Sequence, residues 1–114
     1  MKIVENQFIP FNGYLAINLF GVVFTNDLEK FLLNPKNLRH EYTHTLQYKE
    51  LWYIGFLPVY IWYWLWCLIK YRNLKMAYRM NPLEQEAYDT EGVYEYNEHR
   101  EKFAWKVYIK KLKD

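Results

Sequence analysis

Residues 34–54, NPKNLRHEYTHTLQYKELWYI, decide how this chain folds. Asn34 is a favourable helix N-cap and Pro35 suits the first helical turn, so we expect a helix over residues 35–54. Apolar side chains at positions 38, 42, 46 and 53 are interleaved with polar ones, as in an amphipathic helix. This helix is therefore expected to bury one face against the rest of the fold.

The same helix carries the motif HExxH at positions 40–44. Because residues four apart lie on one helical face, His40 and His44 can both reach one metal ion. Glu41 lies beside them, where it can take a proton from a water. A shuffled chain of this composition would contain the motif with a chance of only about 0.7%. The motif therefore predicts a metal site with Zn²⁺ as its ion and Glu41 as general base.

A zinc site that keeps a position for water needs a third protein ligand. The segment NPLEQEAYD, residues 81–89, predicts a helix that starts at Pro82 and runs through Tyr94 or beyond, and it carries Glu84 and Glu86. The two carboxylates point roughly 200° apart on an ideal helix, so only one can face the metal. Ala87 shares the face of Glu84 and permits close packing, which favours Glu84; Glu86 remains a rival third ligand.

These motifs resemble a known group of enzymes. HExxH followed by a glutamate in an ExxA helix is similar to the gluzincin branch of zinc metallopeptidases. The strings HEYTHTLQYKE, NPLEQEAYD and HREKFAWKVYI also resemble small metallopeptidase-like proteins of Bacteroides-type bacteria, and this resemblance spans residues 11–109. It implies that His40, His44 and Glu84 are zinc ligands and that Glu41 is the general base.

The chain departs from the gluzincin pattern at one position. Many gluzincins have Asp four residues after the ligand glutamate, whereas this chain has Tyr88 there and Asp89 one residue later. The residue that hydrogen-bonds to a ligand histidine is therefore left open. The departure also keeps Glu86 as a rival of Glu84.

The remaining segments complete an α+β fold. Residues 13–25, GYLAINLFGVVFT, predict one or two strands with a bend at Asn18 or Gly21. Residues 26–35 are expected to be a connection, a break at Gly55 and Pro58 precedes a helix over residues 59–72, and residues 99–113 predict a C-terminal helix. The expected architecture is a small N-terminal antiparallel β element followed by a mostly helical zincin-like core, in one domain over residues 1–114.

Aromatic residues make up 21% of the chain, and many lie in the uncharged residues 51–69. Once the first helix has taken positions 51–54, the remaining run, residues 56–69, is about 21 Å long, short of the roughly 30 Å hydrocarbon core of a bilayer. A membrane span is therefore not expected. The run is either a buried core helix or a surface for peripheral membrane contact or self-association, as its Trp residues and basic flank suggest.

Charge and cysteine content narrow the class of protein. A net charge of +2, without a basic stripe interleaved with aromatics, argues against a nucleic-acid partner. Cys67 is the only cysteine and cannot form an internal disulfide. The start MKIVENQFIP lacks the apolar region of a signal peptide. We therefore expect a cytoplasmic protein, peripheral to the membrane if residues 56–69 contact it.

The function expected from these features is zinc-dependent hydrolysis of a peptide bond in a peptide or protein substrate. An edge strand within residues 13–25 could hold an extended substrate. The alternative is a latent or non-catalytic zinc protein that acts as a membrane-interface or partner-binding module through residues 56–69. Two side chains near the motifs are less informative: His99 is expected at the surface, and Gln47 either hydrogen-bonds across the site or faces solvent.

Overall fold

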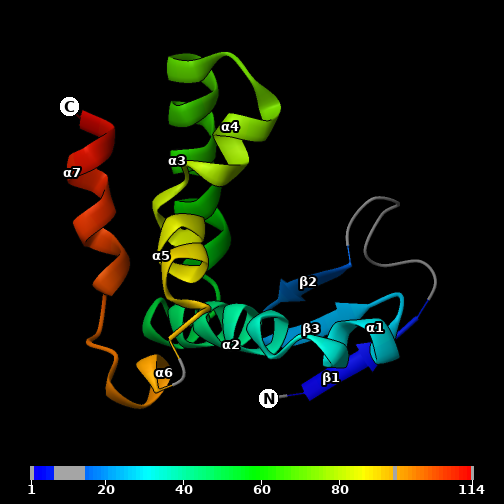
Figure 1. Ribbon diagram of the computed structural model, residues 1–114. Helices are drawn as coiled ribbons and strands as arrows, with labels where there is room; N and C mark the ends of the chain where they lie inside the picture. Colours follow the sequence, from blue (N-terminus) through cyan, green and yellow to red (C-terminus); the bar gives the residue numbers. More distant parts are fainter. Residues whose placement is uncertain (1, 7–14, 94, 114) are drawn as a thin grey trace.

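The computed structural model describes residues 2–6, 15–93 and 95–113 (Figure 1). The fold class is α+β, as predicted: a small N-terminal sheet followed by helices. The strands are β1 (Lys2–Glu5), β2 (Ala16–Leu19) and β3 (Val22–Thr25). The helices are α1 (Leu28–Leu33), α2 (Pro35–Glu50), α3 (Phe56–Tyr71), α4 (Leu74–Arg79), α5 (Pro82–Thr90), α6 (Tyr96–His99), the 3₁₀ helix η1 (Ala104–Lys106) and α7 (Val107–Lys113).

The sheet is mixed, with strand order β1-β3-β2. Strands β2 and β3 form the expected antiparallel hairpin, in which Leu19 lies opposite Val22. The turn falls at Phe20 and Gly21, whose φ angles of 54° and 86° are both positive, as a tight hairpin turn requires. Gly21 is thus at the bend, while Asn18 belongs to β2. Strand β1 was not predicted and pairs parallel to β3; positions 13 and 14 lie outside the described residues.

Helix α2 begins where the sequence predicts. The Asn34 side chain caps its first turn and Pro35 occupies the first helical position. The helix ends at Glu50, four residues before the predicted end. Trp52 and Tyr53 take left-handed φ angles of 59° and 60°, which turn the chain. An apolar run gives no local signal for this conformation, because residues with side chains seldom adopt it.

Four further features differ from the prediction. Residues 26–35 contain the short helix α1, capped by Asp27, in place of a simple connection. Helix α3 begins at Phe56, directly after Gly55, because Pro58 lies in the first turn, where its missing N–H costs no helical hydrogen bond. Helix α5 ends at Thr90, and residues 99–113 form η1 and α7 in place of one continuous helix.

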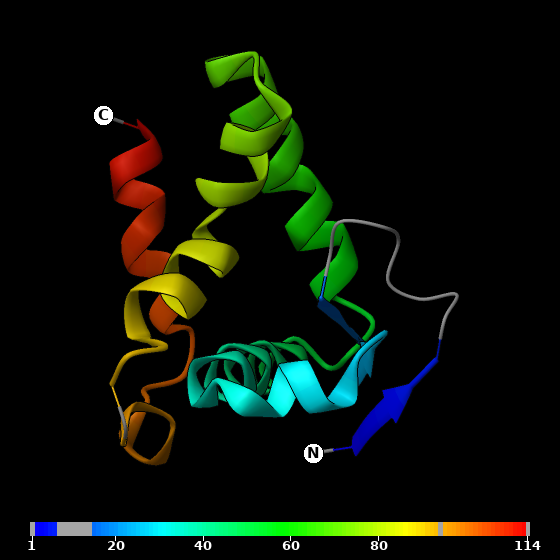
Figure 2. The same ribbon diagram turned by 45° about the vertical axis from the view of Figure 1, so that its right-hand side comes forward.

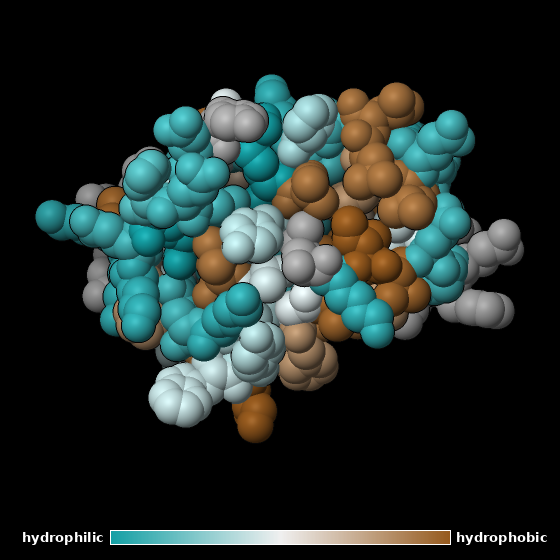
Figure 3. Space-filling view, turned by 90° about the horizontal axis from the view of Figure 1, so that it is seen from below, coloured by the Kyte–Doolittle hydropathy of each residue, from teal (hydrophilic) through white to brown (hydrophobic). Residues whose placement is uncertain are grey.

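Helix α2 lies across the base of the molecule, and the other elements are arranged around it. The sheet and α1 lie toward one end of α2, while α3, α4, α5 and α7 rise on one side of it (Figures 1 and 2). The face seen from below carries hydrophilic side chains over much of its left half and apolar ones toward its right (Figure 3). In the described part of the chain, every helix is too short or too polar to cross a membrane.

Two apolar clusters hold the helices together. Tyr48, Phe56, Leu83 and Trp105 are buried together and join α2, α3, α5 and η1. The Tyr48 and Phe56 rings stack with their centroids 3.8 Å apart. The second cluster joins α3, α4 and α7. The first cluster lies directly behind the HExxH helix and fixes α5 against it.

A buried arginine joins α2 to α5. Arg100 donates to both oxygens of Glu50, at 2.9 and 2.8 Å, and to both oxygens of Glu86, at 2.5 and 2.9 Å. All three side chains are almost fully buried. Trp105 also donates to Glu50, and Tyr96 donates to Glu86. Buried charges persist only when they are paired and hydrogen-bonded in this way.

Arg100→Ala leaves two buried carboxylates without a cation. We expect the free energy of unfolding of the metal-free protein to fall by about 3–5 kcal/mol, measured by urea denaturation. Lys75→Ala is the control, because Lys75 is exposed, and it should change this free energy by no more than about 0.5 kcal/mol. Equal effects of the two changes would contradict a stabilising role for the buried arginine.

Candidate metal centre

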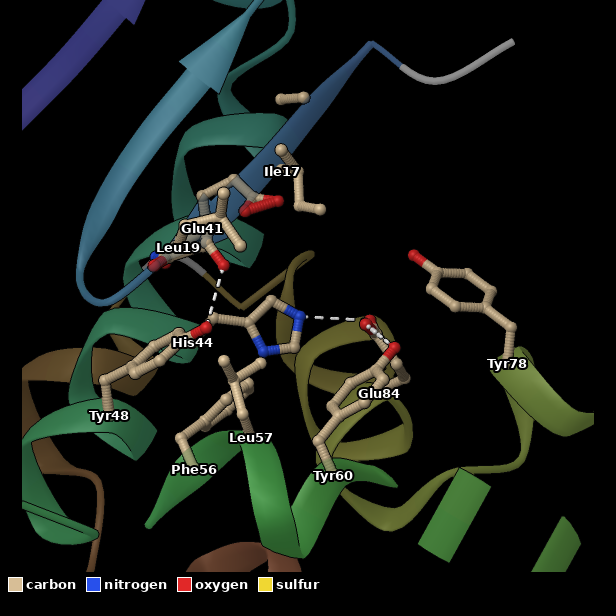
Figure 4. A pocket seen from close by; sticks show the side chains of 12 residues that line it. Ile17, Leu19, Glu41, His44, Tyr48, Phe56, Leu57, Tyr60, Tyr78 and Glu84 are labelled. Atoms are coloured by element: carbon tan, nitrogen blue, oxygen red, sulfur yellow. Dashed lines mark hydrogen bonds and ion pairs between the residues drawn. The ribbon is translucent and has the colours of Figure 1, made fainter. Parts of the chain in front are cut away.

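Three side chains from two helices meet between α2 and α5. Oε1 of Glu84 lies 3.2 Å from Nε2 of His40 and 3.0 Å from Nε2 of His44. All three residues are buried, and their ligand atoms lie within 4.8 Å of one another. Figure 4 shows His44 joined to Glu84 at the wall of a pocket. The group is compact enough to hold one metal ion.

The outer nitrogen of each ring has its own acceptor. Nδ1 of His40 lies 2.8 Å from a carboxylate oxygen of Glu91, and Nδ1 of His44 lies 2.8 Å from Oε1 of Gln47. The Gln47 amide nitrogen donates to a backbone carbonyl of α5 and to Glu86, so its Oε1 is free to accept. Both Nδ1 atoms therefore carry a hydrogen, which directs the Nε2 lone pairs toward Glu84.

The chemistry of this donor set fits a divalent metal. In a neutral ring with hydrogen on Nδ1, Nε2 is an acceptor, and at His44 it faces another acceptor, Oε1 of Glu84, at 3.0 Å. Two acceptors this close require a proton or a cation between them. Two imidazole nitrogens and one carboxylate oxygen are a ligand set that Zn²⁺ takes, and other divalent first-row metals bind similar sets.

In the metal-free protein a proton takes the place of the cation. Burial by itself opposes the charged ring of His44, but the neighbouring Glu84 carboxylate outweighs it and raises the pKa of His44 to about 9. Burial also disfavours ionised Glu84, yet the two histidines hold the pKa of that carboxyl well below its usual range. The site therefore binds a proton at neutral pH, and a metal must displace it.

Glu41 lies beside these ligands and is buried like them. Its Oε2 is buried and has no hydrogen-bond partner among the described residues. Burial raises the pKa of the Glu41 carboxyl above its usual value. A buried oxygen without a partner in a folded protein calls for a water or ligand, and a raised pKa suits a group that takes up a proton.

Two cavities border the site. The first is apolar, about 260 Å³ in volume, and reaches the site past His44 and Glu84 (Figure 4). The second, of about 370 Å³, is lined by His40 and Glu91. The residues that line both cavities are Ala16, Glu41 and Tyr78. Glu41 thus borders both cavities.

Strand β2 forms one wall of the apolar cavity, to which it contributes Ala16, Ile17, Asn18 and Leu19. The buried side chain of Asn18 donates to the backbone oxygen of Glu41 at 2.9 Å and to Thr45 at 2.7 Å. These hydrogen bonds fix the strand alongside α2. An edge strand is therefore held next to the three converging ligands.

The structure separates the two candidate glutamates. Glu84 faces His40 and His44, whereas Glu86 is held by Arg100. Gln47 is buried and hydrogen-bonds across the site. This is the first of the two expected alternatives; the other was a side chain that faces solvent. His99 is exposed, and its ligand atom lies near those of two other exposed residues, Glu95 and Glu98, on the surface.

Two residues at the site escaped the sequence analysis. Glu91, the partner of His40, follows Glu84 by seven residues, so two helical turns on one face could have indicated it. The Tyr60 hydroxyl donates to the second oxygen of Glu84 at 2.8 Å, but nothing distinguishes it in an aromatic helix. At the position of the gluzincin Asp, the Tyr88 ring packs edge-on against His40 with 4.5 Å between centroids.

Comparison of the chain with family models, with curated proteins and with solved structures finds no match. The structure itself shows a buried group of His40, His44 and Glu84, in which the histidines have the spacing of HExxH.

His40→Ala removes one of the three converging donors. We expect the parent protein to bind about one Zn²⁺ per chain, measured by elemental analysis after purification without added metal, and His40→Ala to bind almost none. His99→Ala, the same change at an exposed histidine, should retain the metal. Glu84→Gln should also weaken binding, because a neutral amide is a poor ligand. Zinc retained by His40→Ala would contradict the site.

Metal affinity should depend on pH in a defined direction. Because the pKa of His44 in the metal-free protein is about 9, a metal displaces a proton at any lower pH. The apparent affinity should rise about tenfold for each pH unit from pH 6 to pH 8. Competition with a chelator of known pH dependence measures it. An affinity that stays constant across this range would show that no proton is displaced.

Proposed function

We propose that this protein is a zinc-dependent hydrolase of peptide bonds. The observation that carries the proposal is the position of Glu41 beside three converging metal donors, with a buried Oε2 that no described residue hydrogen-bonds. A site that only stored a metal would not need a buried acid poised next to it. The apolar cavity and the edge strand β2 give a substrate access to the same point.

Each residue has a role that follows from its contacts. His40, His44 and Glu84 would hold the ion, with Glu91 and Gln47 fixing the two rings. Bound Zn²⁺ would supply Lewis-acid chemistry, polarising the scissile carbonyl and lowering the pKa of a water toward about 7. Tyr60 would keep Glu84 in place through its second oxygen.

Glu41 would move the proton. As a carboxylate it would accept a proton from the attacking water, and then donate it to the nitrogen of the leaving amine. Its burial raises its proton affinity, which favours the first of these steps. Because Oε2 has no hydrogen-bond partner among the described residues, this oxygen can take up and release the proton without breaking a hydrogen bond to them.

An extended peptide fits the surroundings of the site. Strand β2 is at the edge of the sheet, so a peptide can add to it through backbone hydrogen bonds. The apolar cavity next to His44 would receive an apolar side chain of that peptide, because Ile17, Leu19, Phe56 and Leu57 line it. We therefore expect substrates with a large apolar residue next to the cleaved bond.

Glu41→Gln tests the role of the carboxylate. The change keeps the size of the side chain and removes its ability to take a proton. We expect the metal content and fold to stay the same while the rate of hydrolysis of a fluorogenic peptide library falls by about 10²-fold or more. His44→Ala is the companion variant and should lose metal and activity together.

Each other result would reject a definite part of the proposal. Loss of metal in Glu41→Gln would make Glu41 a ligand. Hydrolysis by Glu41→Gln at the parent rate would show that the activity arises elsewhere. A parent protein that holds zinc and cleaves nothing in the library would instead be a latent or non-catalytic zinc protein.

A further inference from the structure

The outer face of α3 is apolar along its whole length. Of the sixteen residues of the helix, Lys70 is the only charged one. Side chains three and four residues apart form a continuous exposed stripe on the side away from the core. The stripe consists of Pro58, Ile61, Trp62, Leu65 and Ile69. Trp62 is 64% exposed and Ile69 is 76% exposed.

This face differs from the surface of an ordinary helix. Surface helices carry polar residues on the side away from the core, and helices that are apolar all round are covered on every side. The buried side of α3, at Phe56 and Cys67, packs on the two core clusters. Figures 1 and 2 both show the upper part of α3, with α4, rising away from α2 and the sheet. The stripe is therefore not covered by another element within the described part of the chain.

The charges in the segment that contains the stripe are all of one sign. Residues 51–83 contain four cations and no Asp or Glu, so this segment carries +4 while the rest of the chain is net negative. The four cations are exposed and lie at the end of α3 and in the turn and helix after it. They are Lys70, Arg72, Lys75 and Arg79. None of them forms an ion pair with another described residue.

We propose that the stripe on α3, together with Lys70, Arg72 and Lys75, binds the surface of an anionic lipid bilayer; the fourth cation, Arg79, lies over the Tyr88 ring. Apolar side chains along a helix enter the interface, and Lys and Arg beside them meet lipid phosphates. Trp is enriched at this depth of a membrane. A shallow apolar hollow beside the stripe, lined by Trp62, Trp66 and Ile69 and bordered by Lys70, gives room for an acyl chain next to a cation.

A second copy of the chain fits the same face less well. Two copies packed through the stripe would bring cationic segments close to each other with no carboxylate in either segment to pair them. Glu50, the acid nearest in sequence before α3, is already bound by Arg100. A bilayer supplies both the apolar layer and the negative charge. The charge pattern therefore favours a lipid partner.

Flotation with vesicles tests this binding without reference to metal or hydrolysis. The full chain should float with vesicles of phosphatidylcholine containing 30% phosphatidylglycerol, and should bind vesicles of phosphatidylcholine alone at least tenfold more weakly. Raising the salt concentration should weaken binding to the anionic vesicles. Equal binding to the two vesicle types would overturn the role given to the cations.

Paired substitutions locate the surface. Ile69→Ser should lower the vesicle partition coefficient about tenfold or more. Leu33→Ser is the matched control, since Leu33 is 78% exposed at the end of α1, away from the stripe. It should leave the coefficient unchanged. Arg72→Gln combined with Lys75→Gln should remove most of the preference for anionic lipid while circular dichroism shows the fold retained.

Two results would overturn the proposal. If Ile69→Ser and Leu33→Ser had the same effect, the contact would not involve the stripe. If the parent did not float and sedimented as a dimer that Ile69→Ser dissociated, the partner would be a second copy. Because neither substituted side chain lies at the metal centre, the outcome is separate from that of Glu41→Gln.

Discussion

The guanidinium of Arg100 between Glu50 and Glu86 is the contact on which the rest of the structure depends. It joins the end of α2 to the middle of α5 from a segment that belongs to neither helix. Two carboxylates brought together in a protein interior would repel each other, so the arginine determines how closely the helices approach. The two core clusters then fill the space around this contact.

The geometry of the metal centre depends on this contact of Arg100 with Glu50 and Glu86. Glu86 accepts from Gln47, and Gln47 accepts from the outer nitrogen of His44. The buried ion network and the ring that faces Glu84 are thus connected through one amide. A side chain far from the site in sequence therefore sets the orientation of a histidine, and such supporting contacts commonly tune metal affinity.

The sequence predicted most where local chemistry decides the structure. Asn34 and Pro35 marked the start of α2, and the spacing of His40 and His44 required a shared helical face. The predicted end of α2 was wrong, because Trp52 and Tyr53 take a left-handed conformation that residues with side chains seldom adopt and that their types do not signal. The opposite directions of Glu84 and Glu86 were foreseen from helical geometry. The ion-pair partner of Glu86 was not predicted, because Arg100 comes from a segment outside α5.

The distance along the chain between these partners also orders the assembly of the protein. Glu50 and Arg100 are 50 residues apart, and His44 and Glu84 are 40 apart. Contacts between such distant positions form late, because the intervening chain must first be ordered. During synthesis, α2 and α5 both emerge before Arg100. Glu50 and Glu86 therefore lack their cation until Arg100 has been made. A growing chain therefore acquires its ligand geometry only after the segment that carries Arg100 has been made.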